Sequence, residues 1–459
     1  MAFLTISLYA VIGLTIAANA IYLYINSKKR PAPLPPGPRP EPFIGNLRSI
    51  PPTDHHIFFY ELGDVSYVNI LGQSMVILNS VEAAVDLMEK RSSNYSDRAP
   101  MPVFIRAGWT KTLSMMRYGK EFQLHRRIFQ KHFDKSKISK YESIQLAEAR
   151  ILAQNLLTDP DEKKYLIARF TTSIITSITY GHRIISDEDR YVLLGDEIGK
   201  SSAEAGSTSG ALLDFQFQGS AKPCLVTSEL EALEDKNVNS TVTLDDIKGA
   251  AAQTYAGGAE TTTSSLSAFI MAIILHPEYQ AQAQAELDAV VGTQRLPEFN
   301  DRDSLPFLQC LIDETLRWFS PFPAGIPHLS MEDDVYKGMF IPKGSTIIAN
   351  ARGMSWDEKV YANPFNFEPT RYLPAPLGRG EPRPVAHWGF GRRICPGRHF
   401  ADSSLWIAIA TILSTLSLSK ALDKDGNEIT PEPTETIPIL YEASVGRSYQ
   451  TALSSGHRR

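Results

Sequence analysis

A ten-residue segment near the C-terminus constrains this chain more than any other feature. Residues 388–397 hold Cys395 behind two arginines and between glycines, directly before a predicted helix over 398–416. Glycine adopts positive φ and allows close backbone approach, which we expect at Gly391 and Gly397. Pro396 suits the first turn of a helix, whose N-terminus favours a negatively charged sulfur. The segment could hold a thiolate against a metal cofactor that carries carboxylates; the plainer alternative is a small buried cysteine.

Composition excludes several classes of protein. The 459 residues carry 46 basic and 51 acidic side chains, a net charge of −5, so nothing favours nucleic acid as a partner. The three cysteines, Cys224, Cys310 and Cys395, make no disulfide framework. No P-loop, dinucleotide fingerprint, Gly-x-Ser-x-Gly or His-Glu-x-x-His motif occurs. The chain is therefore not expected to bind its own nicotinamide or flavin, and a redox reaction would take its electrons from a partner protein.

The N-terminus predicts a membrane anchor. Residues 1–27 have no charged side chain and are long enough to cross a bilayer as a helix. Lys28, Lys29 and Arg30 follow, which places the rest of the chain in the cytosol. A cleaved signal peptide is the alternative, but it would carry its positive charge before the apolar run. Residues 28–50 are then expected to form a basic, proline-rich linker, and residues 51–459 the main folded domain.

The body of the chain predicts a mainly α fold with a small β region. Alternation indicates a hairpin over 65–78, and helical periodicity follows over 81–89, 121–133, 138–157 and 165–180. Residues 200–240 lack clear periodicity and are predicted to be loop-like. A second short β region is expected over 335–348.

A long helix carries a polar pair next to two glycines. Thr243 is a suitable N-cap for a helix over 244–275. Gly257 and Gly258 lie in its interior, where each costs about 1 kcal/mol relative to alanine. They indicate either close helix packing or a thinned helix wall that admits a ligand beside Glu260 and Thr261.

An acid and a base, Glu314 and Arg317, lie three residues apart on a predicted helix. Alone, such a pair is usually a weak surface contact. Arg371, in a Pro-x-Arg segment downstream, is a candidate third member.

In their order along the chain, these segments resemble the cytochrome P-450 family of haem-thiolate monooxygenases. The proline-rich hinge, the basic helix, Gly-Gly-x-Glu-Thr, Glu-x-x-Arg, Pro-x-Arg and the cysteine loop occur in the family's order over about residues 30 to 430. The resemblance implies the P-450 fold, preceded here by the transmembrane helix. It also implies haem b (iron protoporphyrin IX) with Cys395 as the axial ligand of the iron.

The resemblance assigns a role to each remaining motif. Glu260 and Thr261 would relay protons to bound dioxygen, and the two glycines before them would leave room for it. The ion pairs would lock the scaffold and retain haem. The candidate residues are Arg393, Arg126 and His328 for the haem carboxylates, Gly257 and Gly258 for dioxygen, and Glu314, Arg317 and Arg371 for the lock.

The implied activity is insertion of one oxygen atom of O2 into a lipophilic small molecule, with electrons from an NADPH-dependent reductase. The expected location is the endoplasmic reticulum membrane, spanned once, with the catalytic domain in the cytosol. Arg127, Lys131 and Arg398 form either a solvated basic face or a docking surface for an acidic reductase.

Four features depart from the family pattern. Trp388 and Phe122 stand where the family usually has Phe and Trp, the roof of the substrate cavity (about 181–243) is short, and the tail (434–459) is atypical. They leave open a haem-binding but catalytically impaired, truncated family member. A haem-thiolate isomerase or dehydratase is a third possibility, against which the Glu260–Thr261 pair argues.

Overall fold

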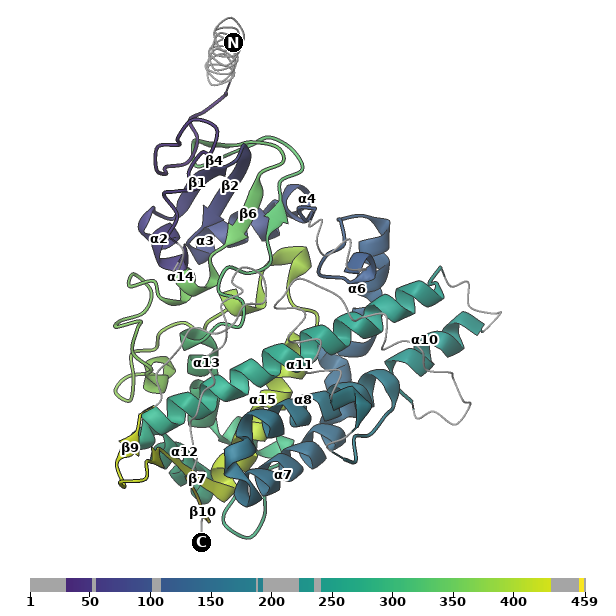
Figure 1. Cartoon of the computed structure of the whole chain (residues 1–459), viewed down its shortest axis with the longest axis vertical. Coiled ribbons are helices and arrows are strands. Elements are labelled where there is room, and N and C mark those ends of the chain that lie inside the picture. Colours follow the sequence, from purple (N-terminus) through teal and green to yellow (C-terminus); the bar gives the residue numbers. More distant parts are fainter. Residues whose placement is uncertain are drawn as a thin grey trace, which may run out of the picture.

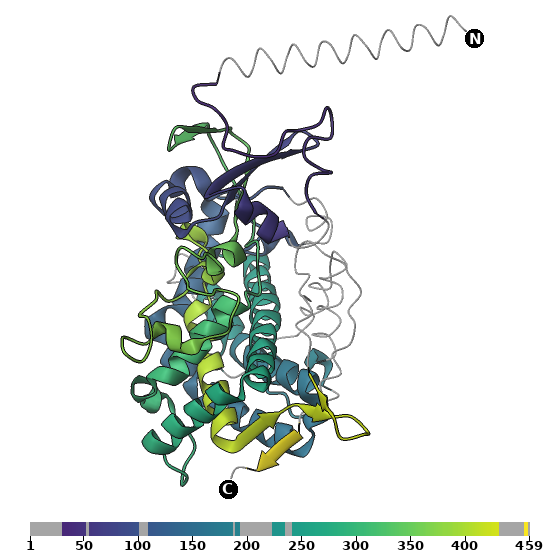
Figure 2. The same ribbon diagram turned by 90° about the vertical axis from the view of Figure 1, so that its left-hand side faces the viewer.

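The computed structural model describes residues 30–51, 55–100, 109–186, 189–192, 223–234, 241–430 and 454–457. The predicted anchor (1–27), and most of the predicted roof and tail, lie outside the described residues. The described part is mainly helical with a small β region, so the predicted fold class is confirmed. Figures 1 and 2 show strands β1, β2 and β6 at one end of the molecule and the long helices in the rest.

The helices form the larger part of the domain. The α-helices are α2 (His55–Glu61), α3 (Val81–Ala84), α4 (Ser92–Tyr95), α6 (Lys120–Phe133), α7 (Glu142–Thr158), α8 (Lys163–Tyr180), α10 (Leu225–Glu234), α11 (Leu244–Leu275), α12 (Pro277–Val290), α13 (Pro306–Trp318), α14 (Ala351–Ser355) and α15 (Arg398–Thr415). Shorter 3-10 or π segments are η1 (Val85–Lys90), η2 (Trp109–Lys111), η3 (Lys135–Tyr141), η4 (Pro160–Glu162), η6 (Phe299–Ser304), η7 (Pro369–Tyr372), η8 (Ala386–Trp388) and η9 (Gly391–Arg393).

The main sheet has the strand order β1-β2-β6-β3. The predicted hairpin is confirmed, because β1 and β2 pair antiparallel; β2 pairs parallel with β6, and β6 pairs antiparallel with β3. The strands are β1 (Val65–Ile70), β2 (Gln73–Leu78), β3 (His328–Leu329), β4 (Asp334–Tyr336), β5 (Met339–Ile341), β6 (Thr346–Ala349), β7 (Leu416–Ser419), β8 (Ala421–Leu422), β9 (Glu428–Ile429) and β10 (Ser454–His457).

Helix α11 crosses the helical part and organises its core (Figure 1). Thr243 begins it as predicted: its hydroxyl accepts the Asp246 amide, and the Asp246 carboxylate accepts the Thr243 amide. The helix packs against α8, α15 and α13. It is long and apolar enough to cross a membrane, but over half of its most apolar window is buried inside the domain, which is the pattern of a core helix.

Three local predictions are wrong. Residues 225–234, predicted to be loop-like, form α10, whose Leu225 is buried against the core. Gly397 has a negative φ of −91°; the positive φ values are at Gly389 and Gly391. Pro396 lies before the N-cap of α15, so it precedes the first helical turn.

Candidate functional site

A cavity of about 210 Å³ brings the predicted cysteine loop and the middle of α11 together. Its walls are mostly apolar, with a few polar groups, as in a site for an organic cofactor. Its polar and sulfur-bearing lining residues include Cys395, Arg98, Arg126, Arg393, His328, His387 and Thr261.

The cysteine loop is held by its own backbone. The Cys395 amide donates to the Trp388 carbonyl oxygen at 2.8 Å, which closes the loop over η9. Gly391 has a φ of +59°, and a Cβ there would lie 1.9 Å from the Met88 carbonyl oxygen. Only glycine fits that position, so the chain path around the sulfur depends on it.

Burial raises the pKa of the Cys395 thiol, against the Gly397 amide and the arginines Arg126 and Arg398, which lower it. The side chain is partly accessible, but to the cavity that it lines. A coordinated metal ion deprotonates a thiol outright, because its charge outweighs the cost of desolvation. The sulfur therefore faces the enclosed cavity and not the outer surface of the protein.

Three arginines line the same cavity without a carboxylate partner among the residues that the structure describes. Arg393 is buried and donates to the carbonyl oxygens of Ser96, Leu113 and Met116. Arg98 is buried too, and Arg126 donates to the Ile394 carbonyl oxygen at 2.7 Å. Backbone carbonyls satisfy these donors but do not neutralise their charge.

The electrostatics of this cluster favour an anion beside the arginines. Burial lowers the pKa of Arg393 to about 10, and the positive charge of Arg126 adds to the shift. Burial and then the charge of Arg393 lower the pKa of Arg98 well below its usual value. Buried like charges are unfavourable unless an opposite charge joins them. A group with two carboxylates and a metal matches the chemistry of these arginines and of the thiol, and haem is such a group.

His328 could donate a hydrogen bond to a haem carboxylate only when both of its ring nitrogens are protonated. Its Nδ1 lies 2.6 Å from the Tyr95 carbonyl oxygen and must donate to it, which leaves Nε2 bare in the neutral ring. Burial, followed by the charges of Arg98 and Arg393, lowers the pKa of His328 well below its usual value. His328 would therefore donate to a carboxylate only after that carboxylate had stabilised its second proton.

The two glycines of α11 face different surroundings. Gly257 lines the cavity, whereas a Cβ on Gly258 would lie 2.4 Å from Cδ1 of Ile175 on α8. Gly258 therefore allows close packing of α8 on α11, and its expected place beside dioxygen is not supported. Thr261 also lines the cavity and donates its hydroxyl to the Gly257 carbonyl oxygen at 2.7 Å. Close helix packing therefore accounts for Gly258, whereas the role of Gly257 beside a ligand stays a prediction.

Glu260 is adjacent to Thr261 in sequence but is not among the residues that line the cavity. Burial alone raises the pKa of its carboxyl group to about 7. An acid with a pKa near neutrality can both take up and release a proton. A buried acid with a raised pKa thus directly precedes in sequence the threonine that lines the cavity.

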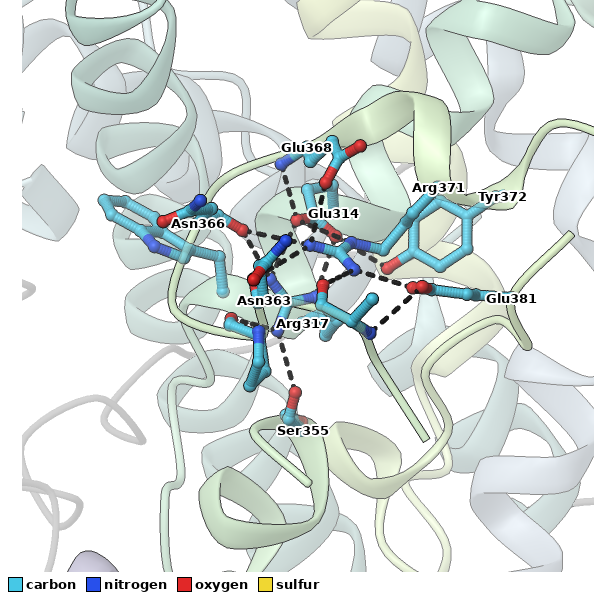
Figure 3. A network of polar contacts seen from close by, with 12 residues as sticks. Glu314, Arg317, Ser355, Asn363, Asn366, Glu368, Arg371, Tyr372 and Glu381 are labelled. Carbon is cyan, nitrogen blue, oxygen red and sulfur yellow. Dashed lines mark hydrogen bonds and ion pairs between the residues drawn. The ribbon is translucent and has the colours of Figure 1, made fainter. Parts of the chain in front are cut away.

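Glu314, Arg317 and Arg371 form one fully buried ionic cluster, with no exposed side-chain surface. Figure 3 shows the Glu314 carboxylate at its centre. Arg317 binds it through two donors at 2.8 Å and Arg371 through Nε at 3.1 Å. The Tyr372 hydroxyl and the Glu368 amide each add a bond at 2.8 Å. Both oxygens of the carboxylate are thus hydrogen-bonded to donors among the described residues.

The cluster connects α13 to the segment that leads to the cysteine loop. Arg371 also donates to Glu381 at 2.6 Å, and Glu381 accepts a further bond from Arg379. Arg317 donates to the carbonyl oxygens of Ser355 and Pro364. The ion pairs therefore fix residues 355–381 against the helix that carries Leu316 into the cavity wall.

A surface groove of about 550 Å³ lies on the outer side of the cysteine loop, against α6. The predicted basic face only partly belongs to it: Lys131 instead pairs with Glu229 of α10 at 2.8 Å. The basic residues that line the groove are Arg126, Arg127, Arg392, Arg398 and His399.

Arg98 and His387 are polar residues of the cavity that sequence reasoning missed. Arg98 follows an acid in an irregular segment, and no periodicity marked it. His387 precedes the cysteine loop and was not singled out. Phe122, which stands where the family usually has Trp, makes a cation–π contact: its ring centroid lies 3.7 Å from the Arg393 guanidinium.

Comparison with known proteins agrees with this geometry. The cytochrome P450 family model matches residues 35–222 and 211–440. Cytochrome P450 monooxygenase 136 of Postia placenta is 36% identical over 454 residues, covering 88% of this chain and 86% of that protein. A cytochrome P450 monooxygenase of Armillaria gallica is also 36% identical, over 87% of this chain and 88% of its own length. A zebrafish cytochrome P450 solved with abiraterone has a TM-score of 0.74 at 22% identity, covering 88% of this chain and all of that one.

Proposed function

The chain belongs to the cytochrome P450 family and is a monooxygenase, and on that premise we propose that Cys395 is the axial ligand of haem b. We further propose that the reaction inserts one oxygen atom of O2 into a lipophilic small molecule. One observation carries the proposal: a single cavity is lined by the Cys395 thiol, by Thr261, and by arginines without a carboxylate partner among the described residues. Thiolate-ligated haem supplies the dioxygen chemistry when it is bound.

The chain's own residues would hold the cofactor by charge. Arg393 and Arg126 are proposed partners of the haem carboxylates, with His328 joining when protonated. The buried Arg98 of the same cavity is added to them here. Their mutual repulsion supports this role, because two carboxylates would neutralise charge that the described residues leave unbalanced.

Proton delivery is proposed for Thr261 and Glu260. The Thr261 hydroxyl reaches the cavity, and its bond to the Gly257 carbonyl fixes its orientation. A carboxyl group with a pKa of about 7 can recharge that hydroxyl with protons at neutral pH. Gly257 would leave space beside the hydroxyl for dioxygen.

Electrons are proposed to come from an NADPH-dependent reductase. The basic groove outside the cysteine loop supports docking of an acidic surface there, since it is lined by four arginines. Residues 1–27 are proposed as a single-pass anchor in the endoplasmic reticulum membrane, with the catalytic domain in the cytosol. The substrate is proposed to be lipophilic because the cavity walls are mainly apolar.

The test uses purified full-length protein, an NADPH-dependent reductase and ¹⁸O₂. Reduced, CO-treated protein should show the red-shifted Soret band of thiolate ligation. Incubation with a panel of lipophilic compounds should give products carrying one ¹⁸O atom. A thiolate spectrum without NADPH oxidation or labelled product would instead favour the impaired family member.

A further inference from the structure

His387 is a polar side chain of the cavity that has no hydrogen-bond partner in the described part of the chain. It lies in η8, and its ring centroid is 4.6 Å from that of Trp388. Both ring nitrogens are buried, and neither has a partner among the residues that the structure describes. The residue lines the same cavity as Cys395.

Three buried histidines of the described chain are each hydrogen-bonded through one ring nitrogen. His125 meets Asp246 at 3.0 Å, His132 meets Glu229 at 2.8 Å, and His328 meets the Tyr95 carbonyl oxygen at 2.6 Å. A buried polar group without a partner is destabilising, so each such group needs an explanation. For His387 the open side is the cavity, where the cofactor would bind.

The chemistry of the imidazole limits what it can do there. Burial lowers the pKa of His387 to about 3, so the ring is neutral at physiological pH and carries one N–H. Ionised haem carboxylates, a thiolate and the porphyrin faces accept hydrogen bonds and donate none. A hydrogen bond between His387 and the haem group must therefore be donated by the N–H of His387.

We propose that His387 is a hydrogen-bond donor to the haem group and a positioning residue that raises the reduction potential of its iron. The inference rests on the proposed haem site and concerns a residue that the site described above does not use. Its neighbour Trp388 supplies the carbonyl that accepts the Cys395 amide, so His387 lies at the base of the cysteine loop. One-electron reduction, with the electron from the reductase, adds negative charge to the haem group. A donor aimed at that group stabilises the reduced state, and its loss makes reduction harder.

The experiment measures the midpoint potential of the full-length, haem-loaded protein by spectroelectrochemistry. His387→Phe keeps a ring against Trp388 and removes both nitrogens, whereas His387→Gln keeps an N–H and removes the ring. His56→Phe is the matched control, because His56 is a buried histidine 5.5 Å from Trp356 and outside the cavity lining.

One hydrogen bond changes an equilibrium constant by about two- to tenfold. We expect His387→Phe to lower the potential by up to about 59 mV, the equivalent of tenfold for a one-electron couple. His387→Gln should stay nearer to the wild type, and His56→Phe should not move the potential. An unchanged potential in His387→Phe, or a larger shift in His387→Gln than in His387→Phe, overturns the inference in favour of ring packing.

The two proposals fail in different ways. Wild-type protein that forms no haem complex overturns both. Wild-type protein with a thiolate-haem spectrum, together with an unchanged potential in His387→Phe, overturns only the role of His387.

Discussion

Glu314→Gln should be among the most destabilising isosteric changes available in this chain. Glutamine keeps the shape of the side chain but removes its charge. It also replaces one carboxylate oxygen by an NH2 group, which cannot accept a hydrogen bond. Both oxygens now accept hydrogen bonds from arginine, and one also accepts the Glu368 amide while the other accepts the Tyr372 hydroxyl. Arg317 and Arg371 would then be left buried with less neutralising charge.

The magnitude follows from the burial of the cluster. Removing one partner of a buried ion pair costs about 3–5 kcal/mol. The Glu314, Arg317 and Arg371 side chains are 0% exposed, so solvent does not screen the loss. A typical domain is stable by only about 5–15 kcal/mol, so the change removes a large part of the stability.

The matched control is Glu82→Gln. Glu82 pairs with Lys337 at 2.9 Å, but the two side chains are 67% and 47% exposed. A surface pair of this kind contributes about 0–1 kcal/mol. Urea unfolding of both variants, followed by circular dichroism and by Soret absorbance, compares the same chemical change in a buried and an exposed pair.

We expect a much lower urea midpoint and early loss of haem for Glu314→Gln, and a midpoint close to the wild type for Glu82→Gln. Equal midpoints for the two variants would refute the reasoning, because they would mean that burial does not set the value of the Glu314 cluster.

Three further outcomes are expected. Glu260→Gln should make the stability less dependent on pH. The folded-state pKa of Glu260 is about 7, above the ordinary 4.5, so the wild type loses stability as pH rises from about 4.5 through about 7. A urea midpoint that falls equally with rising pH in both proteins would contradict this. Thr261→Val should keep the CO spectrum but lower product formed per NADPH by at least about tenfold, since the hydroxyl is lost; unchanged coupling of NADPH to product would remove Thr261 from proton delivery. Arg98→Gln should speed transfer of haem to apomyoglobin, and an unchanged transfer rate would remove Arg98 from the carboxylate site.

Strong local signals made much of the fold predictable. Alternation gave the hairpin of β1 and β2, and the Thr243 capping box gave the start of α11. Residues 225–234 were missed, although they pack as α10 against α8 and α11. The cap of α15 at Gly397 likewise depends on loop geometry that the residue types do not specify.

The site residues that stand in a sequence motif were predictable, whereas those that only folding brings to the cavity were not. Cys395 and Thr261 stand in recognisable strings, and both line the cavity. Gly258 stands in the same string as Gly257, but only the packing of Ile175 shows that it faces α8. Arg98 and His387 come from irregular segments, and their burial around one cavity is a property of the folded chain.

The most direct test of the account compares wild-type and Cys395→Ser protein after reduction and addition of carbon monoxide. The account predicts a thiolate-type, red-shifted Soret band in the wild type and its absence in the variant, because serine cannot supply the sulfur ligand. The same band in both proteins would contradict ligation by Cys395 and the functional assignment built on it.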